Sequence, residues 1–172
     1  MKRRLTILAL TTLAMVALIS VVLMAPSPAS AGGATRIAGV GYFAEPGECT
    51  DFVTGPGEYY EFALNMTGDL DGCHYVHIES FECSPSGTYR ERGTELFVDR
   101  DGVEVGTFGT TYLFTAKLTE CPDLATEIWG RCQHPIVAGS GTGDFSGVTG
   151  RFDIKDDIEA GNFPYKGHLQ FP

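Results

Sequence analysis

The sequence predicts an all-β protein, a single closed antiparallel β-barrel of about eight strands. Three observations predict this class: short runs in which apolar and polar residues alternate, turn-forming Gly, Pro and Asp residues between the runs, and almost no apolar pattern at helical spacing. Sequential hairpins with short links favour a barrel, and closure removes exposed strand edges. A two-sheet β-sandwich remains the alternative.

The N-terminus has the pattern of a secretory signal peptide. Residues 2–4 are basic, residues 5–24 are almost wholly apolar, and residues 29–31 form the small-x-small pattern that a signal peptidase needs. We therefore expect a signal peptide over residues 1–31, a flexible mature N-terminus over residues 32–36 and a barrel domain over residues 37–172. This organisation predicts a secreted or extracytoplasmic protein.

Removal of the leader makes the chain more acidic. Cleavage after residue 31 leaves 141 of the 172 residues and takes away three cations and no anions, so the formal net charge goes from −10 to −13. Such a charge repels phosphates, which excludes nucleic acid as a partner. No apolar run after residue 31 approaches 18 residues, so we expect no membrane span after processing.

The first half of the mature chain contains four expected strands, each followed by a turn. In the second of them, one face carries Phe62, Leu64 and Met66 and the other is more polar, which is typical of a half-buried strand. The turns contain Pro-Gly or Asp-Gly pairs or a Ser-Pro-Ser-Gly run. The four strands are expected over residues 37–43, 59–66, 74–81 and 88–98.

Asp101-Gly102 is the clearest hairpin signal in the chain. The pair suits a tight primed turn that needs positive φ, so a strand is expected from residue 103 to 118, with a bend near Gly109. A short turn around residues 122–126 is the one helical segment that the pattern predicts. The remaining strands are expected over residues 127–138, 151–158 and 165–171.

Five cysteines would reach an oxidising compartment, where disulfides are the default. Five is an odd number, so at least one thiol is free or pairs between chains. A straight strand would hold Cys73 and Cys83 about 33 Å apart, far beyond disulfide reach, and Cys121 and Cys132 meet a similar obstacle. Longer-range bridges are therefore favoured, with the pairing left open. The candidates are Cys49, Cys73, Cys83, Cys121 and Cys132.

A metal site is the less favoured interpretation of the histidines. Cys132 and His134 share one strand face, and His74 and His168 are available, but the sequence has no CxxC or HxxxH spacing of the kind zinc sites show. A bridged cysteine beside a hydrogen-bonded histidine is the simpler expectation. No metal and no cofactor are predicted.

Candidate chemistry rests on acids and tyrosines within strands. Glu61 and Glu95 lie mid-strand, where an inward-facing acid could act in a dry pocket with a raised pKa. The simpler interpretation is that both face solvent. Tyrosines could line a ligand cavity, although aromatic residues on strands more often serve ordinary packing. The tyrosine candidates are Tyr59, Tyr89 and Tyr112.

A glycine-rich segment links two of the expected strands. Residues 136–150 run from an apolar strand end through Gly139, Gly141 and Gly143 to Phe145, and then through Gly147 and Gly150 to the next strand. The glycines permit positive φ and a tight reversal, and Phe145 is free to plug the barrel end.

This segment resembles the Gly-rich strand–turn–strand of the allene oxide cyclase and dirigent superfamily, whose members are eight-stranded antiparallel barrels of calycin-like form. The resemblance covers about residues 136–171, and residues 130–135 are similar to a segment of uncharacterised secreted proteins of that type. Because the motif is structural, it implies the fold and carries over no catalytic residue.

An eight-stranded barrel is either packed with side chains or holds one small ligand. The first hypothesis is therefore non-catalytic binding of a small apolar ligand, or a scaffold or interaction role. The alternative is a cyclase or isomerase acting in the barrel cavity, as the resemblance implies; whether the protein is an enzyme stays open, with binding favoured. Homo-oligomers are a further hypothesis, because an unpaired thiol allows a covalent dimer.

Overall fold

The computed structural model describes residues 33–50 and 60–172. The expected signal peptide over residues 1–31 and the candidate Tyr59 lie outside the described residues. Within them, β1 (Thr35–Phe43) begins inside the segment expected to be flexible, and pairs with β9 (Phe163–Gln170) from Thr35 onward.

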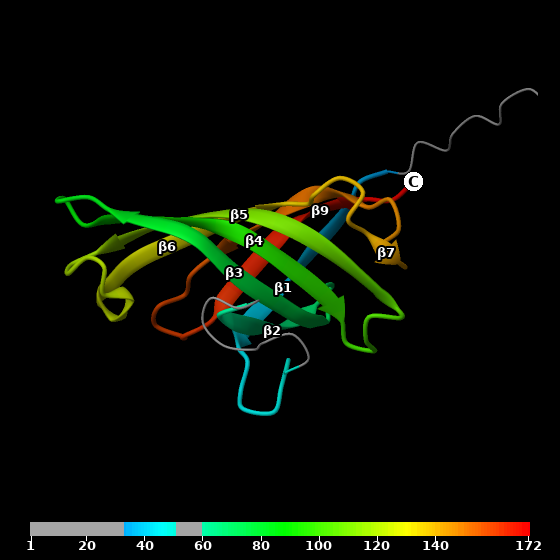
Figure 1. Cartoon of the computed structure of the whole chain (residues 1–172), viewed down its shortest axis with the longest axis horizontal. Coiled ribbons are helices and arrows are strands. Elements are labelled where there is room, and N and C mark those ends of the chain that lie inside the picture. The colour runs from blue at the N-terminus through cyan, green and yellow to red at the C-terminus, as the bar shows by residue number, and fades with distance from the viewer. Residues whose placement is uncertain (1–32, 51–59) are drawn as a thin grey trace, which may run out of the picture.

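The strands form one closed antiparallel barrel, as the sequence predicts (Figure 1). Eight strands follow the order β4-β3-β2-β1-β9-β8-β6-β5, and the pairing of β4 with β5 closes the barrel, which excludes the sandwich. A ninth, two-residue strand, β7, pairs with β5. The remaining bounds are β2 Phe62–Gly68, β3 Gly72–Cys83, β4 Thr88–Asp99, β5 Gly106–Leu118, β6 Glu127–Pro135, β7 Thr142–Gly143 and β8 Thr149–Lys155.

Helical structure among the described residues is limited to a short 3₁₀ turn, η1 (Leu124–Thr126), which lies where the sequence predicts a helical segment. The side chain of Asp123 caps this turn by accepting a hydrogen bond from the Ala125 amide at 3.0 Å. None of the helical structure described is long and apolar enough to cross a membrane.

The hairpin at Asp101-Gly102 differs from the expected two-residue turn. Gly102 does have positive φ, at 105°, but β4 ends at Asp99 and β5 begins at Gly106, so the connection is longer. The Asp99 carboxylate accepts a hydrogen bond from the Asp101 amide at 2.9 Å, which builds a local turn and widens the loop. The prediction of a strand starting at residue 103 was therefore wrong by three residues.

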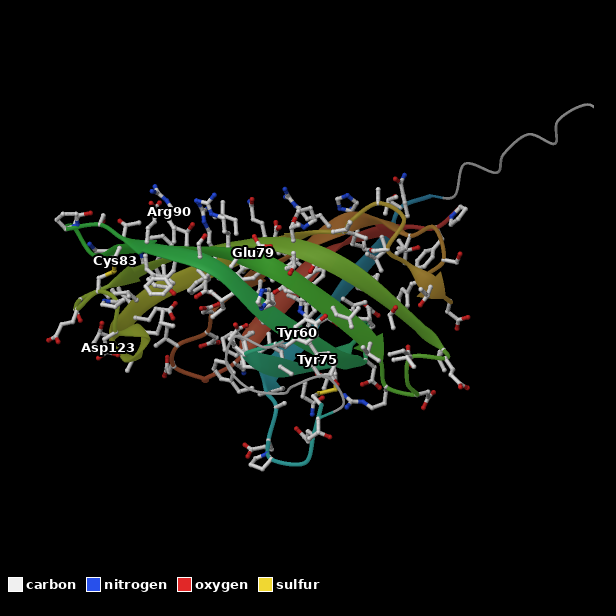
Figure 2. The ribbon with its side chains drawn as sticks, in the orientation of Figure 1. Tyr60, Tyr75, Glu79, Cys83, Arg90 and Asp123 are labelled. Carbon is white, nitrogen blue, oxygen red and sulfur yellow. A yellow bond between two sulfur atoms is a disulfide. The ribbon has the colours of Figure 1, made fainter. Side chains whose placement is uncertain are left out.

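A β-bulge changes which side chains of β3 point into the barrel. The register between β3 and β4 shifts between Ile78 and Ser80, so Glu79 is an extra residue on β3. Because side chains alternate along a strand, the extra residue brings Phe81 to the same face as Tyr89, on which it stacks at 5.6 Å. Figure 2 shows Glu79 and Arg90 on the outer side of these strands.

One end of the barrel is filled by aromatic rings. Phe97 and Phe108 are fully buried and stack with their ring centroids 4.9 Å apart. Phe145, from the glycine-rich segment, packs at 5.0 Å from Phe108 and 5.5 Å from Phe97, as expected of a plug. Four of the five candidate turn glycines have positive φ: Gly139, Gly143, Gly147 and Gly150.

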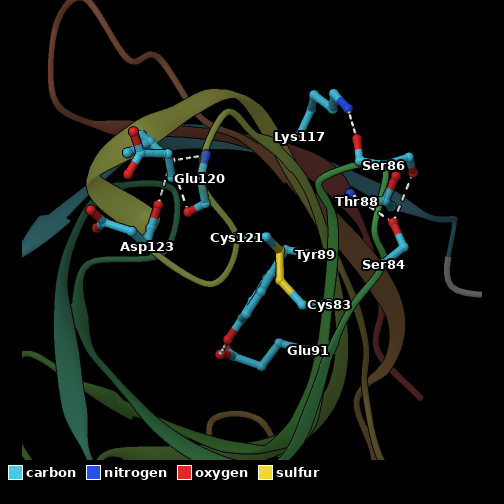
Figure 3. The surroundings of a disulfide bond; sticks show 11 residues. Cys83, Ser84, Ser86, Thr88, Tyr89, Glu91, Lys117, Glu120, Cys121 and Asp123 are labelled. Carbon is cyan, nitrogen blue, oxygen red and sulfur yellow. Dashed lines mark hydrogen bonds between the residues drawn. A yellow bond between two sulfur atoms is a disulfide. The ribbon is translucent and has the colours of Figure 1, made fainter.

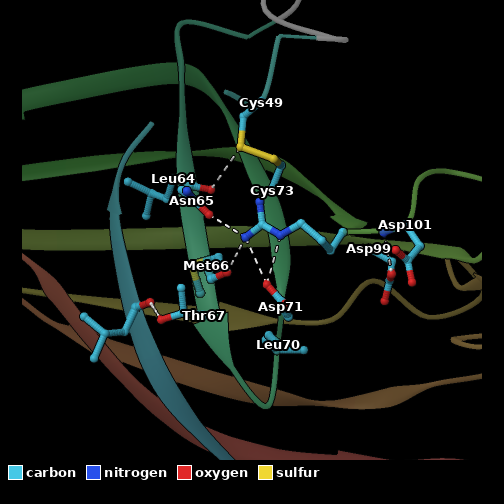
Figure 4. Close-up of polar contacts among 12 residues, drawn as sticks. Cys49, Leu64, Asn65, Met66, Thr67, Leu70, Asp71, Cys73, Asp99 and Asp101 are labelled. Carbon is cyan, nitrogen blue, oxygen red and sulfur yellow. Dashed lines mark hydrogen bonds and ion pairs between the residues drawn. A yellow bond between two sulfur atoms is a disulfide. The ribbon is translucent and has the colours of Figure 1, made fainter. Parts of the chain in front are cut away.

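Two long-range disulfides brace the barrel, as the strand geometry predicts. Cys49 bonds to Cys73, which ties the segment after β1 to the start of β3 (Figure 4). Cys83 bonds to Cys121, which ties the end of β3 to the loop after β5 (Figure 3). Both bridges fit an oxidising, extracytoplasmic compartment. The fifth cysteine, Cys132, is free and buried, so it offers no exposed thiol for a covalent dimer.

We predict that Cys132 is the only thiol of the oxidised protein and that it is shielded in the fold. Under native conditions a polar thiol reagent such as 5,5′-dithiobis(2-nitrobenzoic acid) should not react with it, because the side chain is buried. After unfolding in guanidinium without reductant, one thiol per chain should react. Three or more reactive thiols, or rapid reaction of the folded protein, would contradict the pairing.

Candidate functional site

The barrel contains a cavity of about 730 Å³. All eight barrel strands contribute to its wall, together with η1 and the connection between β8 and β9. These two connecting segments lie toward the barrel end opposite β7 (Figure 1). The apolar part of the wall consists mainly of Phe43, Phe62, Leu64, Val76, Ile78, Phe114, Leu124, Ala125, Cys132, Ile154, Ile158 and Phe163.

Glu95 lies in the cavity wall at the centre of a buried hydrogen-bonded cluster. Its carboxylate accepts hydrogen bonds from His134 Nδ1 at 2.7 Å and from Thr110 Oγ1 at 2.5 Å. His74 Nε2 lies 3.3 Å from Thr110 Oγ1 and 3.4 Å from the carboxylate. The four side chains come from β3, β4, β5 and β6 and are at most 5% exposed, so the cluster joins half of the barrel wall.

Strand register explains how these residues meet. Glu95 lies directly opposite Thr110 on β5 and Val76 on β3. His74 is two residues before Val76 and therefore points into the same interior. His134 is on β6, where its ring stacks on Phe152 at 4.6 Å. Each polar group is thus presented by an inward-facing strand position.

The cluster keeps a negative charge inside the barrel. Burial alone would raise the pKa of Glu95, but the neighbouring His134 and His74 and the hydrogen bonds from His134 and Thr110 lower it to about 2. Burial lowers the pKa of His74 to about 4, so this imidazole is neutral at pH 7. The candidate Glu95 is therefore an ionised, buried carboxylate, and the expectation that it faces solvent was wrong.

The same residues could be considered as metal ligands, because donor atoms of His74, Glu95 and His134 lie within 4.8 Å of one another. A histidine that binds a metal normally donates its other ring N–H to an acceptor. Here the other nitrogens, His74 Nδ1 and His134 Nε2, are buried without a partner. The arrangement therefore fits a hydrogen-bonded cluster better than a metal centre.

Glu91 forms a second polar group, with two of the tyrosines near it. Its carboxylate accepts hydrogen bonds from Tyr89 at 2.6 Å and Tyr112 at 2.8 Å. Burial, together with these hydrogen bonds and the charge of Glu91, raises the pKa of both tyrosines, so both remain protonated donors. Tyr112 lines the cavity, whereas the candidate Tyr89 is buried behind it and does not.

Glu61 does not take part in the cavity. Its carboxylate accepts a hydrogen bond from the Ile78 amide at 2.8 Å and lies 3.4 Å from His77 Nδ1. It is absent from the cavity wall that the described residues form. The two acids singled out in the sequence are therefore separated, with Glu95 in the wall and Glu61 bound to the backbone of β3.

A pair of carboxyl groups lies where the cavity meets the connecting segments. Glu127, at the start of β6, and Asp156, just after β8, both line the cavity. They lie over Gly130, since a Cβ built there would overlap oxygens of both side chains. Burial, followed by the charge and hydrogen bond of Asp156, raises the pKa of Glu127 to about 8. At pH 7 the pair therefore retains a proton.

The carboxyl pair could not be predicted from the sequence, because only the register between distant strands brings its two residues together. Glu127 and Asp156 are 29 positions apart and carry no motif. The sequence does carry a signal for Glu91 and Glu95 on β4. They alternate on one strand face with two aromatic residues, Tyr89 and Phe97. An acid on a face that also carries large aromatic residues is expected to point inward.

Comparison with known proteins assigns this chain to no family. The chain matches no protein-family model, no curated protein and no solved structure.

We predict that Glu95 is essential for stability. Glu95→Ala leaves the His134 N–H and the Thr110 hydroxyl buried without an acceptor, which should lower the free energy of unfolding by about 3 kcal/mol. Glu95→Gln keeps an acceptor oxygen and should cost less. Urea unfolding at pH 7 measures both, with the exposed Glu82→Ala as control. A loss below about 1 kcal/mol for Glu95→Ala would show that the cluster is not bonded as described.

We predict that Glu127 makes the protein less stable as the pH rises. Because its pKa is about 8 when folded and 4.5 otherwise, the unfolded chain releases this proton at lower pH than the folded chain. The free energy of unfolding should therefore fall between about pH 4.5 and 8. Glu127→Gln removes this contribution, so its stability relative to wild type should increase across that range. A difference that does not change with pH would contradict the pairing with Asp156.

Proposed function

We propose that this protein binds a small apolar ligand inside its barrel. The observation that carries the proposal is the cavity of about 730 Å³ with a wall that is mainly apolar. Sites for small molecules are concave, mostly apolar and usually between 300 and 1,000 Å³ in volume, with a few polar groups that orient the ligand. The cavity has this composition: its wall is mainly apolar, and its polar groups lie on β4, β5 and β6 and in the connection between β8 and β9.

The distribution of the core supports binding over a purely structural role. The end near β7 is filled by Phe97, Phe108 and Phe145, which already close the barrel there. The other end has apolar side chains around an empty volume, which leaves dispersion contacts unmade. An apolar ligand would supply those contacts and would remove this wall from water.

A second candidate function is an isomerase or cyclase that acts in the same cavity. The specific observation is the pair of Glu95 and His134: the carboxylate holds His134 Nδ1 at 2.7 Å, which leaves Nε2 buried without a partner and available for general acid–base chemistry. The resemblance of residues 136–171 to allene oxide cyclases and dirigent proteins favours chemistry of this class. We rank it second because the described cavity presents no further group with a defined catalytic partner.

The binding proposal is tested with N-phenyl-1-naphthylamine, a neutral apolar dye whose fluorescence increases in dry surroundings. We expect saturable binding by the oxidised protein. Ile78→Trp places a larger side chain in the cavity and should weaken binding by at least about tenfold, or 1.4 kcal/mol. Leu113→Trp enlarges an exposed residue on β5 and should leave the affinity unchanged.

Absence of saturable binding, or equal effects of the two substitutions, would contradict the proposal. The enzyme alternative predicts a different pattern for Glu95→Gln. That variant should keep its dye affinity while losing turnover of any substrate found, whereas a binding protein should show no turnover to lose.

A further inference from the structure

The cavity wall is acidic as well as apolar. Five acids line it, and none of the described lining residues is Lys or Arg, so His134 is the one basic side chain of the wall. Two of the acids are already satisfied: Glu91 by two tyrosine hydroxyls and Glu95 by His134 and Thr110. Asp157 accepts a hydrogen bond from the Ala160 amide at 3.0 Å. The carboxyl pair of Glu127 and Asp156 is therefore the remaining acidic group of the described wall, to which no Lys, Arg or backbone amide is bound.

The carboxyl groups of Glu127 and Asp156 lie side by side over one backbone position. Gly130 beneath them has no side chain, which makes room for both carboxyl groups over the same backbone position. The ring of Phe114 borders the same position, with its Cε2 atom 2.8 Å from a Cβ built on Gly130. Carboxylates beside an apolar wall suit an organic cation, because the charge binds the carboxylates and the hydrocarbon contacts the wall.

Three polar atoms of the described wall lack a hydrogen-bond partner. Glu127 Oε1, Asn162 Oδ1 and His134 Nε2 are each buried without a hydrogen-bond partner, and all three residues line the cavity. With His134 Nδ1 bound to the Glu95 carboxylate, its Nε2 is free to bind a ligand. His134 is itself 98% buried, with 2% of its surface exposed. The two oxygens, Glu127 Oε1 and Asn162 Oδ1, are acceptors. Buried acceptors without donors are costly, so a fitting ligand brings N–H groups.

We propose that the ligand of this cavity is a lipophilic amine, whose protonated nitrogen binds between Glu127 and Asp156 while its apolar body fills the barrel. The inference rests on the proposed function and specifies its ligand class. A fatty acid or a phosphorylated lipid would bring a further negative charge to an acidic wall. A calcium ion would need six to eight oxygen ligands, and most of this wall is hydrocarbon.

The state of the carboxyl pair agrees with a single bound cation. With the pKa of Glu127 raised to about 8, the pair holds about one proton and one negative charge at pH 7. One ammonium group can replace that proton and leave the pair fully paired. A neutral alcohol of the same length can fill the apolar space but gains nothing from the charge.

The test compares decylamine, 1-decanol and decanoate as competitors of N-phenyl-1-naphthylamine at pH 7. We expect decylamine to displace the dye at concentrations at least about tenfold lower than decanol, with decanoate weakest. In Glu127→Gln/Asp156→Asn the advantage of the amine over the alcohol should disappear, while decanol displaces the dye as in wild type. Retained decanol binding also shows that this variant is folded.

Glu82→Gln/Glu104→Gln is the matched control, since it removes the same number of acids from exposed positions. It should keep the preference for decylamine, which separates a local effect from the net charge of the protein. Decanol binding as tightly as decylamine in wild type would overturn the amine inference and leave the apolar-ligand function standing. Failure of the dye itself to bind would overturn both.

Discussion

In a closed barrel, every polar group that points inward needs a hydrogen-bond partner. The group with the greatest need here is the buried, charged carboxylate of Glu95. A buried charge without partners is costly. The donors that bind this one are Thr110 on β5 and His134 on β6, and His74 on β3 is hydrogen-bonded to Thr110 and lies 3.4 Å from the carboxylate. These strands must keep their register for the bonds to form. The cluster therefore fixes the wall against which the cavity is built.

The barrel is divided into a packed part and a hollow part. Aromatic rings, among them Phe97 and Phe108, fill the end near β7. Phe152 packs against both His74 and His134. Beyond the Glu95 cluster, side chains line the barrel wall but do not fill the interior. The bond between Cys83 and Cys121 holds the end of β3 to the loop after β5. Covalent bracing of this kind keeps an incompletely packed end in shape.

Much of the fold was predictable because strand alternation and turn residues are local signals. The glycine-rich segment 136–150 and the role of Phe145 followed from the sequence for the same reason. The pairing of the cysteines and the meeting of His74 with His134 did not, since both depend on register between distant strands. The bulge at Glu79 defeats a simple alternation count, because one extra residue changes which side chains face inward. Glu61 and Glu95 looked alike in sequence, and only tertiary structure separates them.

The central claim is that the hollow part of this barrel is a ligand site bordered by the Glu95 cluster. Methyl NMR of the labelled protein during titration with N-phenyl-1-naphthylamine tests it most directly. We expect shifts of the methyl groups of Leu64, Val76 and Ile154, which line the cavity, and none at Val148 or Leu169 in the packed part. Shifts confined to exposed residues such as Leu113 and Val137, or none at saturating dye, would contradict it.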